Sequence, residues 1–120
     1  MAQVTGVGGV FWRADDPDGL RDWYADVLGI VDPPGDVWQQ EAGPTVLATF
    51  PRDSEHFGLD QQFMVNFRVR GLSDLLEQLR SRGVEVVREE HEDGVGEFAW
   101  ILDPEGNRVE LWQPAEDSAT

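Results

Sequence analysis

Residues 97–114 read EFAWILDPEGNRVELWQP, and this stretch decides the fold of the chain. It predicts two short strands joined by a tight turn at residues 103–107, because Pro104 fixes φ at the first turn position and Gly106 accepts a positive φ. A register that sets Asp103 opposite Asn107 then pairs Leu102 with Arg108, Trp100 with Glu110, and Phe98 with Trp112. These six side chains share one face, since alternate residues of a strand point the same way. Glu110 is therefore expected among aromatic rings, where an unpaired charge is costly.

The composition limits the classes of protein to consider. A chain of 120 residues makes one small domain, and the absence of cysteine excludes disulfides, thiolate ligands and a cysteine nucleophile. Nine basic and 24 acidic residues give a net charge of −15, which argues against nucleic acid and membrane partners. The acidity serves solubility, or it attracts a cationic ligand. With no signal peptide pattern and no membrane span, the sequence predicts a cytoplasmic protein.

The first half of the chain predicts a strand, a helix and two or three further strands. Residues 7–14 are apolar and predict the first strand. Asp16 and Pro17 are helix-start residues, and Gly29 is placed to end the helix. The apolar residues between them recur at helical spacing: Leu20, Trp23, Tyr24, Val27 and Leu28. Residues 32–35 predict a turn, and residues 37–40 and 45–50 predict strands.

The pattern restarts after residues 51–62, a polar segment that reads as a linker and as a flap over a site. Residues 63–69 predict a strand, and Ser73 is expected to cap a helix that ends at Gly83. Its apolar face is formed by Leu72, Leu75, Leu76 and Leu79. Residues 84–87 then predict a short strand and residues 89–96 an acidic turn.

The order of elements therefore occurs twice, which indicates an internal duplication. Module one spans about residues 5–51, the linker residues 52–62 and module two about residues 63–114. The tail, residues 115–120, is expected to be disordered.

A paired βαβββ pattern with DWYADVLG at residues 22–29 and DPEGNRVELWQP at residues 103–114 resembles the vicinal oxygen chelate superfamily. That group includes glyoxalase I, extradiol dioxygenases, fosfomycin-resistance enzymes and bleomycin-resistance proteins. The resemblance implies an α+β fold, in which two βαβββ modules lie side by side around a concave pocket. It also implies a homodimer, in which a pocket can borrow residues from the partner.

The resemblance places the family's metal ligands at Gly9, Met64 and Glu110. Glycine has no side chain to offer, and methionine is a soft ligand unsuited to the metals of this family. We therefore expect no metal and no other cofactor, with a divalent metal as the alternative. The two histidines do not clearly replace the missing metal ligands. His56 lies in the linker, from which it could reach a pocket, and His91 lies in an acidic run.

Strand alternation extends the candidate ligand-binding face beyond the hairpin. Phe11 and Arg13 fall on the face of Gly9, while Asn66 and Arg68 fall on that of Met64. The predicted ligand-binding set is Phe11, Arg13, Met64, Asn66, Arg68, Phe98, Trp100, Glu110 and Trp112. Apolar walls with a few polar groups are typical of sites for small organic molecules. Alternatively, these aromatic side chains fill the core and Glu110 pairs with Arg13 or Arg68.

Three functions remain open from the sequence. The first is a metal-free binding protein that sequesters an aromatic or cationic compound, with Glu110 paired to the cation and Trp100 or Trp112 stacked on it. The second is an enzyme of the superfamily, a lyase, isomerase, epimerase or dioxygenase, with Glu110 as catalytic base or metal ligand. The third is a dimeric scaffold with a closed pocket.

Overall fold

The computed structural model of the chain describes residues 2–30 and 37–116. Its elements are α1 (Pro17–Val27), β1 (Asn66–Arg68), α2 (Leu72–Ser81), β2 (Val86–Glu92), β3 (Gly96–Leu102) and β4 (Arg108–Pro114). The strands form one sheet in the order β1-β4-β3-β2. β1 runs parallel to β4, and the other two pairs are antiparallel. The predicted turn at residues 32–35 and most of the predicted tail lie outside the described residues.

The hairpin of β3 and β4 has the predicted register, with Phe98 opposite Trp112 and Trp100 opposite Glu110. At its tip the N–H of Asp103 donates to the carbonyl of Asn107 at 3.0 Å. Gly106 adopts a φ of +83°, the left-handed conformation for which glycine is suited. Local turn chemistry therefore sets the register of the central strands.

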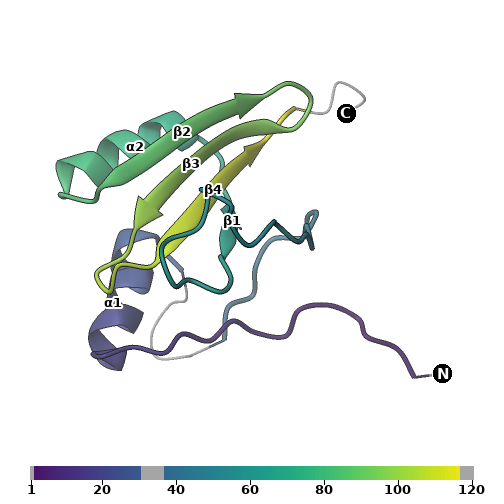
Figure 1. The fold of residues 1–120 in the computed structure, drawn as a ribbon, viewed down its shortest axis with the longest axis horizontal. Helices are drawn as coiled ribbons and strands as arrows, with labels where there is room; N and C mark the ends of the chain where they lie inside the picture. The colour runs from purple at the N-terminus through teal and green to yellow at the C-terminus, as the bar shows by residue number, and fades with distance from the viewer. Residues whose placement is uncertain (1, 31–36, 117–120) are drawn as a thin grey trace.

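Both helices pack on the same face of the sheet (Figure 1). The core contains α1 and α2 residues together with the inward side chains of β3 and β4: Leu20, Tyr24, Leu72, Leu76, Leu79, Ala99, Ile101, Val109 and Leu111. The linker lies on the other side of the sheet, where the ring of His56 packs against that of Trp100. The two helices thus leave that face of the sheet to the linker.

The start of α1 agrees with the sequence, whereas the start of α2 does not. Asp16 caps α1 by accepting a hydrogen bond from the N–H of Gly19 at 3.1 Å. The prediction that Ser73 caps α2 is wrong, since the helix already begins at Leu72. The N–H of Leu72 instead donates to Oε1 of Gln113 on β4, at 2.8 Å. A side chain distant in sequence therefore takes the capping role.

The strands predicted at residues 7–14, 37–40 and 45–50 are not formed among the described residues. Of the twelve large hydrophobic side chains that are exposed in the described parts of the chain, eleven lie in residues 4–63. A strand needs a neighbour for its N–H and C=O groups, and these segments have no partner strand within residues 2–30 and 37–116 of the single chain. The structure therefore shows one sheet, and the side-by-side pairing of two modules stays a prediction.

Strand β2 is longer than the sequence predicts. The first half of the segment assigned to an acidic turn, residues 89–92, belongs to β2, and the chain reverses at residues 93–95. The charges are tolerated because β2 is an edge strand and because cations pair with them. Arg80 of α2, for example, lies 2.7 Å from Glu89. Glu90 consequently points to the face opposite the helices, across from Phe98.

Candidate functional site

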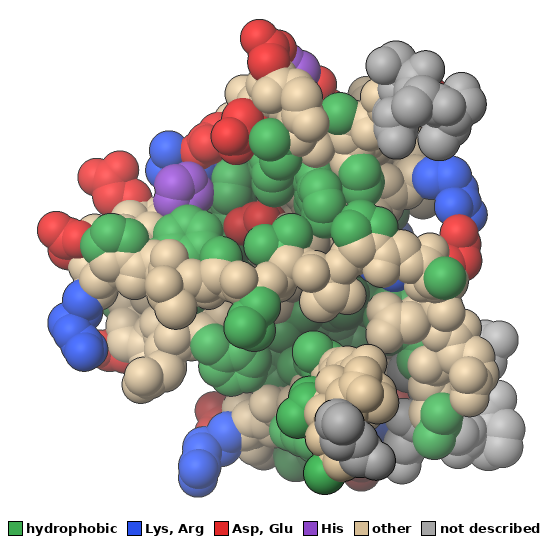
Figure 2. Space-filling view, turned by 90° about the vertical axis from the view of Figure 1, so that its right-hand side faces the viewer, with side chains coloured by type: hydrophobic (Ala, Val, Ile, Leu, Met, Phe, Trp, Pro, Cys, Tyr) green, Lys and Arg blue, Asp and Glu red, His purple; other side chains and the backbone are tan. Residues whose placement is uncertain are grey.

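Three aromatic rings form a nearly parallel row on the sheet face opposite the helices. The rings of Phe98 and Trp100 lie 6.0 Å apart at 19°, and those of Phe98 and Trp112 lie 6.2 Å apart at 6°. The antiparallel register produces this row, because Phe98 faces Trp112 across the strands. Figure 2 shows hydrophobic side chains gathered across one side of the molecule, with acidic groups among them. We call Phe98, Trp100, Trp112 and Glu110 the aromatic face.

Glu110 lies beside these rings and is only 8% exposed. Its Oε1 accepts a hydrogen bond from Nδ2 of Asn66 at 2.6 Å, and its Oε2 accepts one from Nε1 of Trp100 at 3.1 Å. Burial raises the pKa of Glu110, and the two hydrogen bonds offset part of that rise. Both donors are neutral. The arrangement therefore holds a carboxylate whose charge is stabilised by hydrogen bonds and would be stabilised further by a cation.

The linker brings His56 onto the aromatic face. The imidazole ring lies 5.1 Å from the ring of Trp100, and Nε2 lies 3.3 Å from Oε2 of Glu90. On its other side, Nδ1 lies 3.3 Å from Oγ of Ser54. The charges of His56 and Glu90 both act on the pKa of Glu110, His56 lowering it and Glu90 raising it. These groups form one electrostatic cluster over Trp100, which is itself only 3% exposed.

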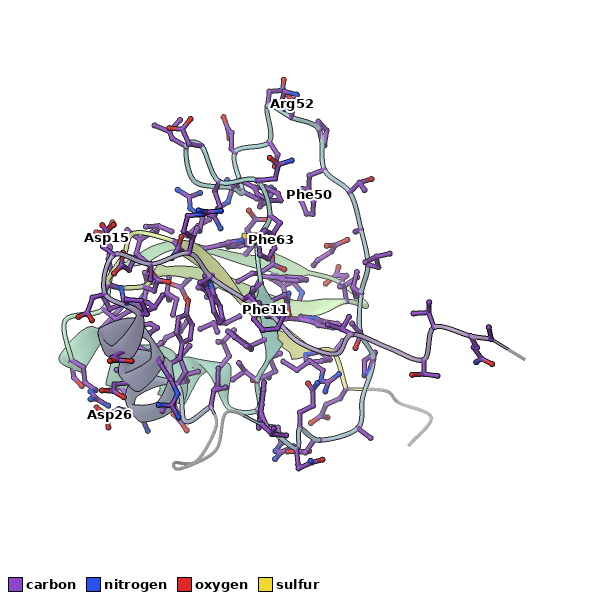
Figure 3. All side chains as sticks on the ribbon, turned by 90° about the horizontal axis from the view of Figure 1, so that it is seen from below. Phe11, Asp15, Asp26, Phe50, Arg52 and Phe63 are labelled. Atoms are coloured by element: carbon purple, nitrogen blue, oxygen red, sulfur yellow. The ribbon has the colours of Figure 1, made fainter. Side chains whose placement is uncertain are left out.

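Backbone and side-chain hydrogen bonds fix the linker against β4. The amide of Gln61 donates to the carbonyl of Arg108 at 2.8 Å and accepts from the N–H of Arg108 at 3.0 Å. Nη1 of Arg108 also donates to the carbonyl of Glu55 at 2.8 Å. Figure 3 shows Phe50 and Phe63 on the side of the sheet away from Asp26 of α1. The linker therefore lies against the aromatic face at Trp100.

Other members of the predicted ligand-binding set differ in their surroundings. Phe11 is 85% exposed, and Met64 is half-buried just before β1. Arg68 lies opposite Trp112 and so shares the aromatic face, but its guanidinium donates to the carbonyl oxygens of Glu41, at 2.7 Å, and Pro44. No hydrogen bond or ion pair joins Arg13 or Arg68 to Glu110 in the described parts of the chain, so the alternative of an arginine partner is wrong for this structure. The neutral donors Asn66 and Trp100 bind the Glu110 carboxylate instead.

Sequence reasoning missed Glu90 and Arg88, because the acidic segment after residue 88 read as a turn. Both alternate onto the aromatic face once β2 is extended to Glu92. Arg88 contacts Oε2 of Glu90 through Nε, and its Cζ lies 5.9 Å from the Trp100 ring centre. The signal available in the sequence was the alternation of residues 88 and 90, which the run of charges concealed. An irregularity between Val86 and Arg88 turns Val86 to the helix side, and no local pattern indicates it.

The remaining histidine, His91, lies on the other face of β2. Its ring nitrogens lie 2.5 Å from Glu97 and 2.7 Å from Asp93, and these carboxylates raise its pKa. Its side chain is 58% exposed.

The family's metal positions do not form a ligand set here. No group of three or more His, Cys, Asp or Glu side chains among the described residues is placed to hold a metal ion. Gly9 contributes no donor atom, and both carboxylate oxygens of Glu110 already accept hydrogen bonds. The residues present therefore do not fit a metal in this arrangement of the chain.

A family model of the glyoxalase-like domain matches residues 9–112. The chain belongs to this family of glyoxalase-like domains, within the vicinal oxygen chelate superfamily. The mixed sheet with few helices agrees with the βαβββ fold of that group. No curated protein sequence matches the chain. No helix within residues 2–30 and 37–116 is long and apolar enough to cross a membrane.

Solved structures with the same fold include an antibiotic binding protein and a lyase. TnmS3, an antibiotic binding protein from Streptomyces sp. CB03234, is 21% identical with a TM-score of 0.64, over 96% of this chain and 100% of that one. A glyoxalase/bleomycin resistance protein/dioxygenase superfamily member from Sphaerobacter thermophilus is 21% identical with a TM-score of 0.61, over 92% and 98%. Lactoylglutathione lyase from Agrobacterium tumefaciens is 18% identical with a TM-score of 0.54, over 91% and 96%. At these identities the likeness concerns the fold.

Proposed function

We propose that the chain is a small-molecule binding protein of the glyoxalase/bleomycin-resistance type, with a degenerate metal site, which sequesters an aromatic or cationic compound at the aromatic face. The observation that carries this proposal is the row of parallel rings beside a buried carboxylate held by neutral donors. Parallel rings offer stacking surface to a planar ligand, and the carboxylate offers a partner for its charge. The fold shared with an antibiotic binding protein agrees with this role.

Tryptophan fluorescence during titration with a panel of planar aromatic compounds, neutral and cationic, tests the proposal. We expect saturable quenching by at least one cationic member. Trp112→Ala removes a stacking ring, and Glu110→Gln removes the charge partner. A lost hydrogen bond to a charged group costs about 1.5–3 kcal/mol, which corresponds to roughly 10- to 150-fold in affinity.

Trp23→Phe is the matched control, because Trp23 lies on α1 beside the core and not on the aromatic face. Its affinity should equal that of the wild type. The proposal is overturned if no member of the panel binds, or if the Trp112 and Glu110 variants bind as well as the Trp23 variant.

The same proposal includes a homodimer. The exposed apolar side chains of residues 4–63 lie largely on extended segments without a partner strand, and a second copy would supply partner edges. Leu47 is 96% exposed in the single chain, so Leu47→Asp leaves the monomer's packing intact. Light scattering on a sizing column should give twice the 13.5 kDa chain mass for the wild type and a lower mass for Leu47→Asp. A wild-type monomer at all concentrations refutes the dimer.

A second candidate is an enzyme of the superfamily that uses Glu110 as a general base. The raised pKa of Glu110 supports it, since a base whose pKa approaches the working pH transfers protons well. With the substrate bound, Glu110→Gln would abolish turnover while leaving affinity within a few fold. If the chain is only a binding protein, Glu110→Gln lowers the affinity for the ligand, and neither the wild type nor the variant turns the ligand over.

A further inference from the structure

His56 resembles a bound ligand of the aromatic face. Its ring is planar, it can carry a positive charge, and it lies over Trp100 next to two carboxylates. Trp100 is only 3% exposed with the histidine in this position. A ligand that stacks on Trp100 must therefore take the place of the imidazole ring.

A second planar cation from the chain lies at the same indole. Cζ of Arg88 lies 5.9 Å from the Trp100 ring centre, within the range of a cation–π interaction. Two planar side chains, an imidazole and a guanidinium, are thus gathered at one ring. The chain's own contacts indicate which chemical group this ring accepts.

The carboxylate of Glu90 offers an anionic partner for a ligand cation. Its Oε2 lies 3.3 Å from Nε2 of His56 and in contact with Nε of Arg88. A ligand N–H that replaced the imidazole would take over the contact that His56 makes with this oxygen. The other charged groups around His56 are Glu110 and, through Arg88, Glu55 at 4.0 Å. Acidic groups predominate, which favours a cation.

The contacts that hold His56 are replaceable. The distances from its ring nitrogens to Ser54 and Glu90 are both 3.3 Å, at the long end for hydrogen bonds. The linker is anchored independently at Gln61, five residues further along the chain, by two hydrogen bonds to β4. The ring can therefore leave Trp100 while the linker stays attached.

We infer that His56 occupies the ligand position in the free protein, and that a small planar cation of the amidinium, guanidinium or imidazolium class displaces it to stack on Trp100 between Glu90 and Glu110. This inference rests on the proposed binding function and names its ligand class. It makes His56 a competitor whose removal strengthens binding.

Calorimetric titration of the full chain with benzamidinium, a planar amidinium, tests the inference. His56→Ala should bind more tightly than the wild type, by about tenfold if the ring leaves Trp100 a tenth of the time. Benzamide has the same shape without the charge and should bind at least tenfold more weakly. Glu90→Gln in the His56→Ala background should reduce the gain.

His91→Ala is the matched control, since His91 lies on the opposite face of β2, and its affinity should equal that of the wild type. Acrylamide quenching of the ligand-free proteins should increase in His56→Ala and not in His91→Ala, because Trp100 becomes accessible. Equal or weaker benzamidinium binding by a folded His56→Ala overturns the displacement while the binding function stands. Binding of neutral aromatics from the panel without benzamidinium binding overturns the ligand class, and absence of all binding overturns the proposed function as well.

Discussion

Tyr24 on α1 joins the first half of the chain to the turn between β3 and β4. Removal of its hydroxyl group tests that connection directly. The tyrosine hydroxyl donates to Oδ2 of Asp103 at 2.7 Å, and both residues are 5% exposed. Burial and this hydrogen bond raise the pKa of Tyr24, so the hydroxyl stays protonated as a donor. Tyr24→Phe removes the hydroxyl and keeps the ring, which stacks 4.5 Å from Trp12.

The expected loss follows from the partners that remain. A hydrogen bond to a charged group contributes about 1.5–3 kcal/mol. Asp103 keeps the N–H of Glu105 and two donors of Asn107, so no buried oxygen is left without a partner. The loss in free energy of unfolding should therefore lie near the lower limit, at about 1.5–2 kcal/mol.

Urea unfolding followed by circular dichroism measures this loss, and the melting temperature should fall by about 5–8 °C. A double-mutant cycle with Asp103→Asn separates the hydrogen bond from other effects of either change. If Tyr24→Phe unfolds at the wild-type urea concentration, α1 does not depend on the turn as the structure indicates.

Three further predictions concern the turn, the buried carboxylate and the linker. Glu105→Gln weakens the acceptor that binds the two N–H groups before α1, each at 3.0 Å, and should lower the free energy of unfolding by about 0.5–1 kcal/mol in urea. The pKa of Glu110 is raised in the folded state, so deprotonation costs the folded protein more than the unfolded one. As the pH rises from the ordinary carboxyl pKa through the raised pKa, the wild type should therefore lose stability relative to Glu110→Gln. A difference in melting temperature between the two proteins that does not change with pH contradicts this. Gln61→Ala releases the linker and should speed tryptic cleavage after Arg52, whereas the neighbouring exposed Gln62→Ala should not.

The central hairpin could be predicted because its determinants are local. Proline and glycine at fixed turn positions set the reversal, and strand alternation then placed Phe98, Trp100 and Glu110 together. The first helix was equally local, with a capping Asp16 and one apolar stripe. These features need no knowledge of distant parts of the chain.

Features that depend on distant partners could not be predicted. An apolar, alternating segment predicts a strand only where an edge is available, and residues 45–50 have none among the described residues of the single chain. The cap of α2 comes from Gln113, 41 residues away from Leu72. The contact of His56 with Trp100 and Glu90 likewise requires the linker's attachment to β4, which no sequence pattern reveals.

The central claim is that a planar cation binds at Trp100 beside Glu110, and the Trp100 indole N–H reports on it directly because it donates to that carboxylate. A two-dimensional NMR spectrum of ¹⁵N-tryptophan-labelled protein should contain five indole signals, assigned by single Trp→Phe variants. Addition of benzamidinium should shift the Trp100 signal saturably and leave the Trp23 signal in place. A Trp100 signal that stays fixed while other signals move, or while none moves, contradicts the account.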